Sequence, residues 1–478
     1  MVFFYYKNKL YNKIVIKNIY RHINLLGDVM KKKLFISAIF ILLLLTGAFL
    51  IFDKKNLDNN INNIEVTVLD IDNGVMTIKD KNDYIYKVNF EDKSLKVGST
   101  VVLEYKGMIN EEKEFQNVEI VSYEEKDIEE LQSLLDDNGI FSDYYSLAKE
   151  KLSKMTLDEK ISQMLLVRYP DDNTAVNIQK KYQFGGYIFF KKDFADKTKD
   201  QVKEMIKKVQ VASKIPMLTA VDEEGGIVVR VSSNPKLSSS AFKSPSELYN
   251  EGGLELIKKD TLNKSDLLAS LGLNLNLAPV IDVSTNATDY MYSRSIQQNT
   301  EITAEYAKTV INASKSNSVS YVLKHFPGYG SNYDTHTDEV IDNRSYESII
   351  NVDLPPFESG IDAGAEAVLV SHNIVVNIDK ENPASLSPEI NSLLRNELGF
   401  TGIIITDDLD MEAISNLEDA TIKAVKAGND LIITTDYMTS LNAIKKAISN
   451  GELTENQIEK ASQRIIAWKY YKGLIDES

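Results

Sequence analysis

Short apolar runs alternate with amphipathic stretches from about residue 145 onward, and this alternation restricts the fold more than any other feature of the chain. Strands that are apolar at nearly every position are typical of a parallel sheet covered by helices on both faces. The runs of β-forming composition are residues 186–190, 216–221, 273–277, 319–323, 367–370, 402–406 and 430–434. Their number favours a (β/α)8 barrel of the TIM type over a doubly wound sheet, so we predict an α/β fold with a single barrel over residues 145–478.

The segments between these runs predict the covering helices. Residues 200–211, 301–313 and 439–449 are amphipathic with helical spacing. Residues 453–471 are predicted to form two closing helices. No glycine-rich phosphate-binding turn follows the first run, which argues against a nucleotide-binding fold.

The N-terminal region contains one segment long and apolar enough to cross a bilayer. Residues 34–52 are uncharged, and their length is close to the ~20 residues that a membrane-spanning helix needs. Three lysines, residues 31–33, precede this segment and Asp53 follows it, so the positive-inside tendency places everything after it outside the cytoplasm. We therefore predict a transmembrane helix and a protein of the cell membrane; the alternative is a cleaved signal peptide and a secreted protein.

The remaining N-terminal segments differ in composition from the barrel region. Residues 1–33 form a basic leader, and Met30 before the lysines resembles a natural start, so residues 1–29 are interpreted as an extension that need not be translated. Residues 53–63 are polar and predict a flexible stalk. Alternating segments over residues 64–123 predict a small all-β domain, OB-like or similar, for which the sequence identifies no partner. Residues 124–144 are acidic and predict a linker.

Composition excludes several classes of function. The net charge of the chain is −16. Residues 1–33, with eight Lys or Arg and one Asp, have a net charge of +7, so residues 34–478 have a net charge of −23. So acidic a body argues against a nucleic-acid partner. The chain has no cysteine, so disulfides, thiolate metal sites and thiol nucleophiles are excluded.

Polar and titratable residues follow the predicted strands at the points where the strands end. They are Asp222, Asp282, Lys324 with His325, Ser371 with His372, and Asp407 with Asp408. Because the active sites of such barrels lie at the C-terminal ends of the strands, we expect these side chains to meet on one rim.

The sequences of these motifs, and their order along the chain, resemble those of one enzyme family. The segment K-H-F-P-G-Y-G at 324–330, followed by D-T-H at 334–336, is similar to the K-H-F-P-G-H-G and D-S-H signature of bacterial β-N-acetylglucosaminidases of glycoside hydrolase family 3. Further similar segments occur in the family's order, with the resemblance covering roughly residues 145–470: 221–226 together with Arg230, 293–295, 371–374, 383–385 and 406–411.

The resemblance implies a role for each matching residue. Asp407 is expected to be the catalytic nucleophile, with Asp408 as the adjacent alternative. His336 is expected to be the acid and base, oriented by Asp334, because a retaining glycosidase needs a group that protonates the leaving oxygen. The residues expected to bind the sugar are Asp222, Arg230, Arg294, Lys324 and His325.

These roles predict a retaining exo-β-N-acetylglucosaminidase that removes terminal N-acetylglucosamine from peptidoglycan fragments (muropeptides) outside the cell, with no metal and no cofactor. The expected partners are a carbohydrate substrate and, through one N-terminal helix, a membrane. Tyr329 replaces the histidine that is usual in the motif, which is expected to change substrate fit rather than the catalytic pair. The chain is also expected to be the single-barrel form of the family.

Alternative functions on the same residues remain open. Phosphorolysis of N-acetylglucosaminides is the nearest, because a histidine acid does not repel an incoming phosphate anion. A tethered sugar-binding protein without catalysis is a second. A metal-dependent hydrolase is disfavoured, because no H-x-H spacing occurs and Lys324 beside His325 would repel a cation. A β-glucosidase or β-xylosidase of the family is disfavoured because those enzymes place a glutamate acid on a second domain.

Overall fold

The computed structural model describes residues 62–72, 75–80, 85–89, 100–109, 115–125, 139–330, 340–411, 414 and 419–477. The chain divides into two compact units, Met1–Ser133 and Leu134–Ser478. The predicted leader (1–33), transmembrane segment (34–52) and nearly all of the stalk lie outside the described residues. Among the helices that are described, none has the length and apolar character required to cross a membrane. The anchor therefore stays a prediction.

The N-terminal unit contains a five-stranded antiparallel sheet. Its strands lie in the order β3 (Ile85–Asn89), β2 (Val75–Asp80), β1 (Asn62–Asp72), β4 (Thr100–Ile109) and β5 (Phe115–Glu125). Alternate residues such as Val66, Ile78 and Leu103 build a small core of their own. An antiparallel sheet is what the alternating sequence predicts here; its OB-like character stays a prediction.

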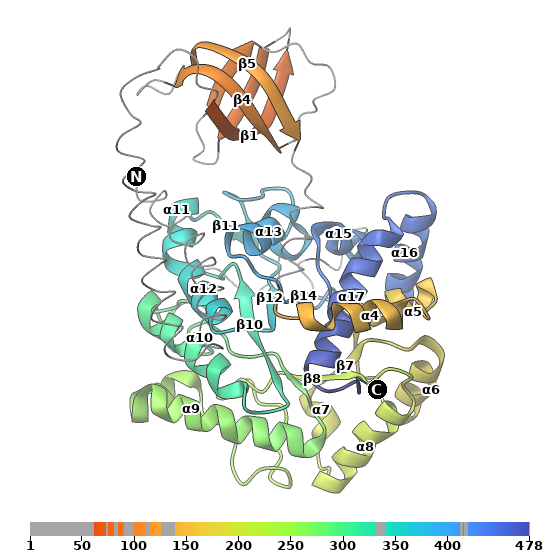
Figure 1. Ribbon diagram of the computed structural model, residues 1–478. Coiled ribbons are helices and arrows are strands. Elements are labelled where there is room, and N and C mark those ends of the chain that lie inside the picture. The colour runs from red at the N-terminus through yellow and green to blue at the C-terminus, as the bar shows by residue number, and fades with distance from the viewer. Residues whose placement is uncertain are drawn as a thin grey trace, which may run out of the picture. The chain divides into compact units, whose positions relative to one another are not determined.

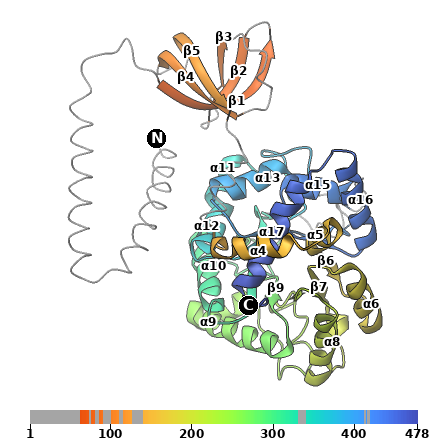
Figure 2. The same cartoon turned by 45° about the vertical axis from the view of Figure 1, so that its right-hand side comes forward.

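The C-terminal unit is built on an eight-stranded parallel sheet that is nearly closed into a barrel (Figures 1 and 2). Around the barrel the strands follow one another in chain order. A bridge between Ile405 and Leu431 joins the last two strands, β14 and β15. The short strands are buried along most of their length, as their apolar composition predicts. The strands are β6 (Leu165–Arg168), β7 (Gly186–Phe189), β8 (Leu218–Val221), β9 (Leu275–Asn276), β10 (Ser320–Phe326), β12 (Ala367–Val370), β14 (Ile403–Thr406) and β15 (Ile432–Thr434).

The predicted barrel is confirmed, with one strand that the sequence reading missed. Strand β6 was not among the seven predicted runs. It has only four residues and ends on a charged side chain, Arg168, and it directly follows the helix that ends at Gln163. Only Met164 lies between that helix and the strand, and no turn residue marks the boundary, so the pairing with β7 and β15 is what identifies the segment as a strand.

Helices surround the sheet (Figure 1). Those predicted at 200–211, 301–313 and 439–449 are confirmed by α8, α10 and α16. The helices are α4 (Tyr145–Leu152), α5 (Leu157–Gln163), α6 (Asp172–Tyr182), α7 (Lys191–Phe194), α8 (Lys199–Val211), α9 (Pro245–Leu271), α10 (Thr300–Ser314), α11 (Tyr346–Ser348), α12 (Leu354–Asp362), α13 (Pro388–Ser392), α15 (Ala420–Ala427), α16 (Tyr437–Ser449) and α17 (Glu455–Tyr471), with short 3-10 or π turns η1 (Ser142–Tyr144), η2 (Ile349–Asp353), η3 (Ala384–Leu386) and η4 (Leu393–Glu397).

The prediction of two helices over residues 453–471 is wrong. The structure has a single helix there, α17, which begins with a capping box between Thr454 and Gln457. No glycine or proline interrupts the segment that follows, so nothing in the sequence breaks the helix before Tyr471.

A two-stranded parallel sheet lies outside the barrel. Strand β11 (Ile341–Asp342) pairs with β13 (Ile374–Val375). This pairing ties the chain that follows residues 331–339 to the segment just after β12. It therefore connects two of the motif-bearing segments of the sequence.

Candidate active site

A cavity of about 380 Å³ lies at the C-terminal ends of the barrel strands. Every predicted site residue within the described parts of the chain lines it: Asp222, Arg230, Arg294, Lys324, His325 and Asp407. Asp334 and His336 lie outside the described residues. The cavity wall also includes five polar or aromatic residues to which the sequence assigned no role: Arg168, Phe190, Glu224, Tyr290 and Ser293.

The floor of the cavity is a buried network of opposite charges. The ammonium of Lys324, whose side chain is 3% exposed, lies 2.8 Å from Asp222 Oδ1 and 2.6 Å from Glu224 Oε1. Glu224 also accepts two hydrogen bonds from Arg294, at 3.0 Å from Nε and 2.7 Å from Nη2. Burial opposes ionisation of Glu224, but Arg294 and Lys324 outweigh it and hold the pKa of this carboxyl well below its ordinary value. Glu224 therefore fixes two of the predicted sugar-binding cations.

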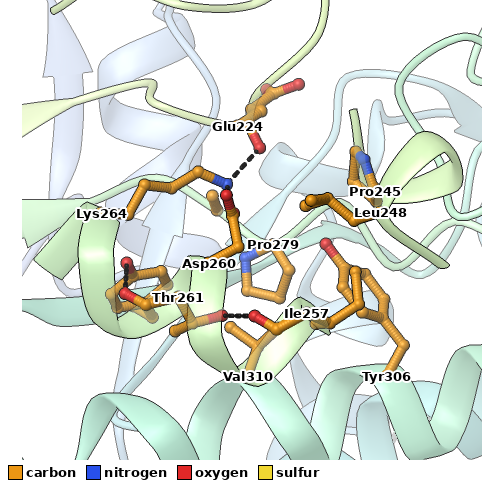
Figure 3. A pocket seen from close by; sticks show the side chains of 12 residues that line it. Glu224, Pro245, Leu248, Ile257, Asp260, Thr261, Lys264, Pro279, Tyr306 and Val310 are labelled. Atoms are coloured by element: carbon orange, nitrogen blue, oxygen red, sulfur yellow. Dashed lines mark hydrogen bonds and ion pairs between the residues drawn. The ribbon is translucent and has the colours of Figure 1, made fainter. Parts of the chain in front are cut away.

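The backbone of Glu224 is hydrogen-bonded to a side chain of α9. A small cavity of about 20 Å³, room for about one water, lies on the side of Glu224 toward α9 (Figure 3). There the ammonium of Lys264 donates to the carbonyl oxygen of Glu224 at 2.9 Å and pairs with Asp260 at 2.7 Å. These contacts support the turn that carries Glu224. Glu224 lies in the E-E-G-G motif at 223–226. The motif alone does not indicate whether this carboxylate contacts a ligand or orients neighbouring cations.

His325 has a hydrogen-bonding partner at each of its ring nitrogens. Its Nδ1 lies 2.8 Å from Asp282 Oδ2, and its Nε2 lies 3.3 Å from Arg294 Nη2. Burial lowers the pKa of the imidazole, and this effect exceeds the opposing effect of Asp282. A neutral ring that donates from Nδ1 to Asp282 can accept from Arg294 at Nε2. His325 is thus oriented from both sides.

Tyr329, the departure from the family motif, packs beside His325. Its side chain is buried, and its ring centroid lies 5.3 Å from that of His325 and 5.8 Å from that of Tyr290. Its backbone N–H donates to Asp282 Oδ1 at 2.8 Å. Tyr329 does not itself line the cavity but packs against His325 and Tyr290, which do, and its expected effect on substrate fit stays a prediction.

Two arginines share one aromatic ring at the mouth of the cavity. The guanidinium carbon of Arg168 lies 5.0 Å, and that of Arg230 5.7 Å, from the centroid of the Phe190 ring. Arg230 Nη2 is 3.9 Å from Asp222 Oδ2. Their side chains are 38% and 28% exposed, whereas Lys324 at the floor is enclosed. Arg168 was missed because its strand, β6, was missed.

The adjacent carboxylates Asp407 and Asp408 have different surroundings. Asp407 follows β14, is partly exposed and receives a hydrogen bond at Oδ1 from the N–H of Asp408, at 2.9 Å. The carboxylate of Asp408 is 9% exposed and forms an ion pair with Arg168 at 2.5 Å. Burial raises the pKa of Asp408 to about 6 although Arg168 opposes this. Of the two, Asp407 is the better placed to meet a ligand.

For Ser371 and His372 the sequence predicts a place either at the rim or behind the residues that line the site, and their contacts place them behind it. His372 is buried between Ser385 Oγ, 2.7 Å from Nδ1, and the carbonyl oxygen of Asp408, 3.0 Å from Nε2. Ser371 Oγ donates to the carbonyl oxygen of Phe326 at 3.0 Å. Neither residue is among those that line the cavity.

The cavity is suited to an uncharged polar ligand. Its buried carboxylates are paired with cations, so both hydrogen-bond donors and acceptors are held in place with little net charge. Sugar hydroxyls, which donate and accept, match such a surface, because hydrogen bonds to charged groups are the stronger ones.

Comparisons with known proteins assign the chain to a family. Residues 156–468 match the N-terminal domain of glycosyl hydrolase family 3. The beta-hexosaminidase of Xanthomonas campestris pv. campestris (strain B100) is 32% identical over 232 residues, which are 48% of this chain and 69% of that protein. The beta-hexosaminidase of Stenotrophomonas maltophilia (strain K279a) is 33% identical over 234 residues, 48% of this chain and 68% of that protein.

Solved structures show the same likeness. A glycoside hydrolase family 3 beta-N-acetylglucosaminidase from Paenibacillus sp. str. FPU-7 superposes with a TM-score of 0.64 and 27% identity, covering 68% of this chain and 64% of that chain. A family 3 glycosyl hydrolase from Mycobacterium smegmatis superposes with a TM-score of 0.60 and 28% identity, covering 66% of this chain and 97% of that chain.

Fold, cavity and relatives together define an enzyme of the glycoside hydrolase class. The chain belongs to glycosyl hydrolase family 3, and the curated relatives that it matches are beta-hexosaminidases. The resemblance seen in the sequence motifs is therefore confirmed.

Proposed function

We propose that the protein is a retaining exo-β-N-acetylglucosaminidase that acts on peptidoglycan fragments. The observation that carries this proposal is the position of Asp407: a partly exposed carboxylate in the same cavity as Asp222, Arg230, Arg294, Lys324 and His325. The cavity, about 380 Å³, lies near the lower end of the ~300–1,000 Å³ typical of small-ligand sites, which suits one terminal sugar rather than a chain.

In the proposed reaction Asp407 attacks the anomeric carbon while the glycosidic bond breaks. The leaving oxygen takes a proton from His336, and a glycosyl ester forms on Asp407. Water then attacks the anomeric carbon, His336 accepts a proton from that water, and Asp407 is released with the sugar in its original β configuration. Asp334 orients His336 throughout.

The carboxylates that line the cavity have partners that make them poor candidates for the proton donor of the proposed reaction. Asp222 and Glu224 are bonded to Lys324, and Asp408 is paired with Arg168. Within the described wall of the cavity, these carboxylates serve as partners of cations rather than as proton donors. This favours a donor in residues 331–339, where the family motif has Asp334 and His336.

The proposed leaving group is an N-acetylmuramic acid unit or a related sugar. Two partly exposed arginines, Arg168 and Arg230, lie at the mouth, where an anionic group of the leaving sugar would be attracted. A histidine is cationic as the acid and neutral as the base, so, unlike a carboxylate, it does not repel such a group. The predicted anchor at 34–52 would place the enzyme outside the cell, where these substrates occur.

Digestion of defined muropeptides tests the proposal. We expect release of one N-acetylglucosamine from the non-reducing end, observed first as the β anomer by proton NMR, with the muramyl peptide left intact. An α anomer as first product would contradict retention, and internal cleavage would contradict exo action. The digest is run in phosphate-free and phosphate-rich buffer, and a sugar phosphate in the second would replace hydrolysis by phosphorolysis.

A further inference from the structure

Asp408 is held at every polar group of its backbone and side chain. Its N–H donates to Asp407 Oδ1 at 2.9 Å, and its carbonyl oxygen accepts from His372 Nε2 at 3.0 Å. Its Oδ1 accepts from the N–H of Asp410 at 3.1 Å, and its Oδ2 pairs with Arg168 Nε at 2.5 Å. The residue that contacts Asp407 is therefore fixed from four directions.

His372 follows β12, which is adjacent to β14, whereas the Arg168 contact comes from a strand that is not adjacent to β14. Arg168 ends β6, whereas Asp408 follows β14, and β15 lies between these two strands in the sheet. The ion pair thus crosses the place where the barrel closes. The guanidinium of Arg168 is itself steadied by the ring of Phe190, 5.0 Å away.

Arg168 is the strongest of the groups that favour the charged form of Asp408, and a hydrogen bond from the N–H of Asp410 also favours it. Burial disfavours the carboxylate, Arg168 favours it, and the neighbouring carboxylate of Asp410 opposes it. His372 contacts only the carbonyl oxygen of Asp408. Protonation of Asp408, or loss of Arg168, would remove the ion pair that joins the turn after β14 to the end of β6.

We propose that Arg168, acting through Asp408, is a positioning residue for Asp407: the ion pair fixes the Asp408 amide, and that amide holds one carboxylate oxygen of Asp407 in a single orientation. This inference rests on the proposed role of Asp407 as nucleophile. Nothing in the inference requires Arg168 to touch the substrate.

A fluorinated N-acetylglucosaminyl fluoride, whose ester with the enzyme hydrolyses slowly, isolates the step in question. The carboxylate of Asp407 forms a bond to the anomeric carbon and fluoride leaves with its electron pair, so little protonation by His336 is needed. The rate of mass gain by the intact full-length protein measures this attack. We expect Arg168→Gln to be labelled at least about 10-fold more slowly than the wild type at saturating reagent. Arg168→Lys, which keeps a cation, should recover part of the rate.

A pH profile gives a second readout. Removal of Arg168 takes away the cation that favours ionised Asp408, so the acid side of the labelling profile should move to higher pH in Arg168→Gln. Asp408→Asn cannot ionise; it should label slowly and lose this shift. A change in stability alone would leave both profiles in place. If Arg168→Gln does not fold, Arg168→Lys and Asp408→Asn carry the test.

Arg464→Lys is the matched control. Arg464 is buried and pairs with Asp430 at 2.9 Å at the opposite end of β15, so this variant should lose stability and keep the wild-type labelling rate. Wild-type labelling of Arg168→Gln at saturation would overturn the inference, as would a defect confined to the reagent concentration needed for half-maximal rate. Failure of the wild type to label Asp407 would overturn the proposed function instead.

Discussion

At the scale of single residues, identical chemical groups in this site have different functions because their neighbours differ. Asp407 and Asp408 are consecutive, yet one is partly exposed in the cavity and the other is buried against Arg168. His325 and His372 are both buried, yet only His325 lines the cavity. Exposure and partner, rather than residue type, decide which group can meet a substrate.

Replacement of Glu224 by glutamine should be costly for both stability and activity. The change removes a buried negative charge that Lys324 and Arg294 share, so two cations remain partly unpaired. We expect the free energy of unfolding to fall by about 3 kcal/mol, as for other broken buried ion pairs, in urea denaturation.

Glu251→Gln is the control for Glu224→Gln, because Glu251 pairs with Lys243 on the exposed surface. It should change stability by less than about 1 kcal/mol. Equal effects of the two variants would show that the floor network does not depend on the Glu224 charge.

Replacement of His336 by alanine tests the proposed acid through its dependence on the leaving group. Natural disaccharides have leaving oxygens that need protonation, whereas dinitrophenyl glycosides do not. We expect His336→Ala to lower kcat/KM by about 10²-fold or more on the disaccharide and far less on the aryl glycoside. Comparable losses on both substrates would count against His336 as the acid.

At the scale of elements, the motif turn after β10 is packed against a cluster of charges that the sequence reading did not identify. Arg344 donates to Asp342 and Asp353, and its Nη2 lies 3.2 Å from the carbonyl oxygen of Gly328. Burial raises the pKa of Asp353 to about 7 although Arg344 opposes this. These contacts join the chain before residues 331–339 to the chain after them.

Gly330→Ala and Gly399→Ala form a matched pair that measures this packing. Both glycines have left-handed backbone, with φ of 58° and 62°. A Cβ at Gly330 would lie 2.3 Å from Arg344 Cζ, whereas one at Gly399 would meet no atom within 4 Å. Gly399→Ala should cost about 1 kcal/mol from the backbone alone, and Gly330→Ala about 1–3 kcal/mol more, measured by thermal or urea unfolding. Equal costs would mean that Arg344 yields freely.

At the scale of the whole molecule, buried charged side chains also occur away from the cavity that Asp407 lines. Lys469 in α17 is fully buried and donates to Gln163 Oε1 at 2.7 Å and to the carbonyl oxygen of Gly185 at 3.0 Å. Burial lowers the pKa of this ammonium to about 7. Because its partners are neutral, the protonated form is tolerated rather than favoured.

This lysine should make stability depend on pH. Above about pH 7 the folded protein loses the proton of Lys469, whereas the unfolded chain keeps it up to about pH 10.5, so its contribution to stability rises with pH across this window. Relative to Lys469→Met, the wild type should gain roughly 1 kcal/mol per pH unit between pH 7 and 9, by urea unfolding at each pH. A constant difference between the two proteins would show that Lys469 does not titrate in this range.

The sequence predicted much of this architecture because its signals are local. Apolar runs of four to six residues mark seven of the eight barrel strands. The six predicted site residues that the structure describes occur at strand ends or in the motifs that follow them, and the closed sheet brings them into one cavity. Strand β6 and Arg168 were missed because only the apolar residue Met164 separates this strand from the helix before it, so no turn marks where the strand begins, and a lone arginine carries no sign of its partner.

By itself, then, the amino-acid sequence determined the fold class, the family and six of the polar residues that line the cavity, because hydrophobic spacing and short motifs can be read within a few residues of chain. Only the tertiary structure decided the partners: Glu224 between Lys324 and Arg294, and Arg168 across β15 on Asp408. Such contacts join residues far apart in the chain, and the burial that sets their strength exists only when the barrel has closed.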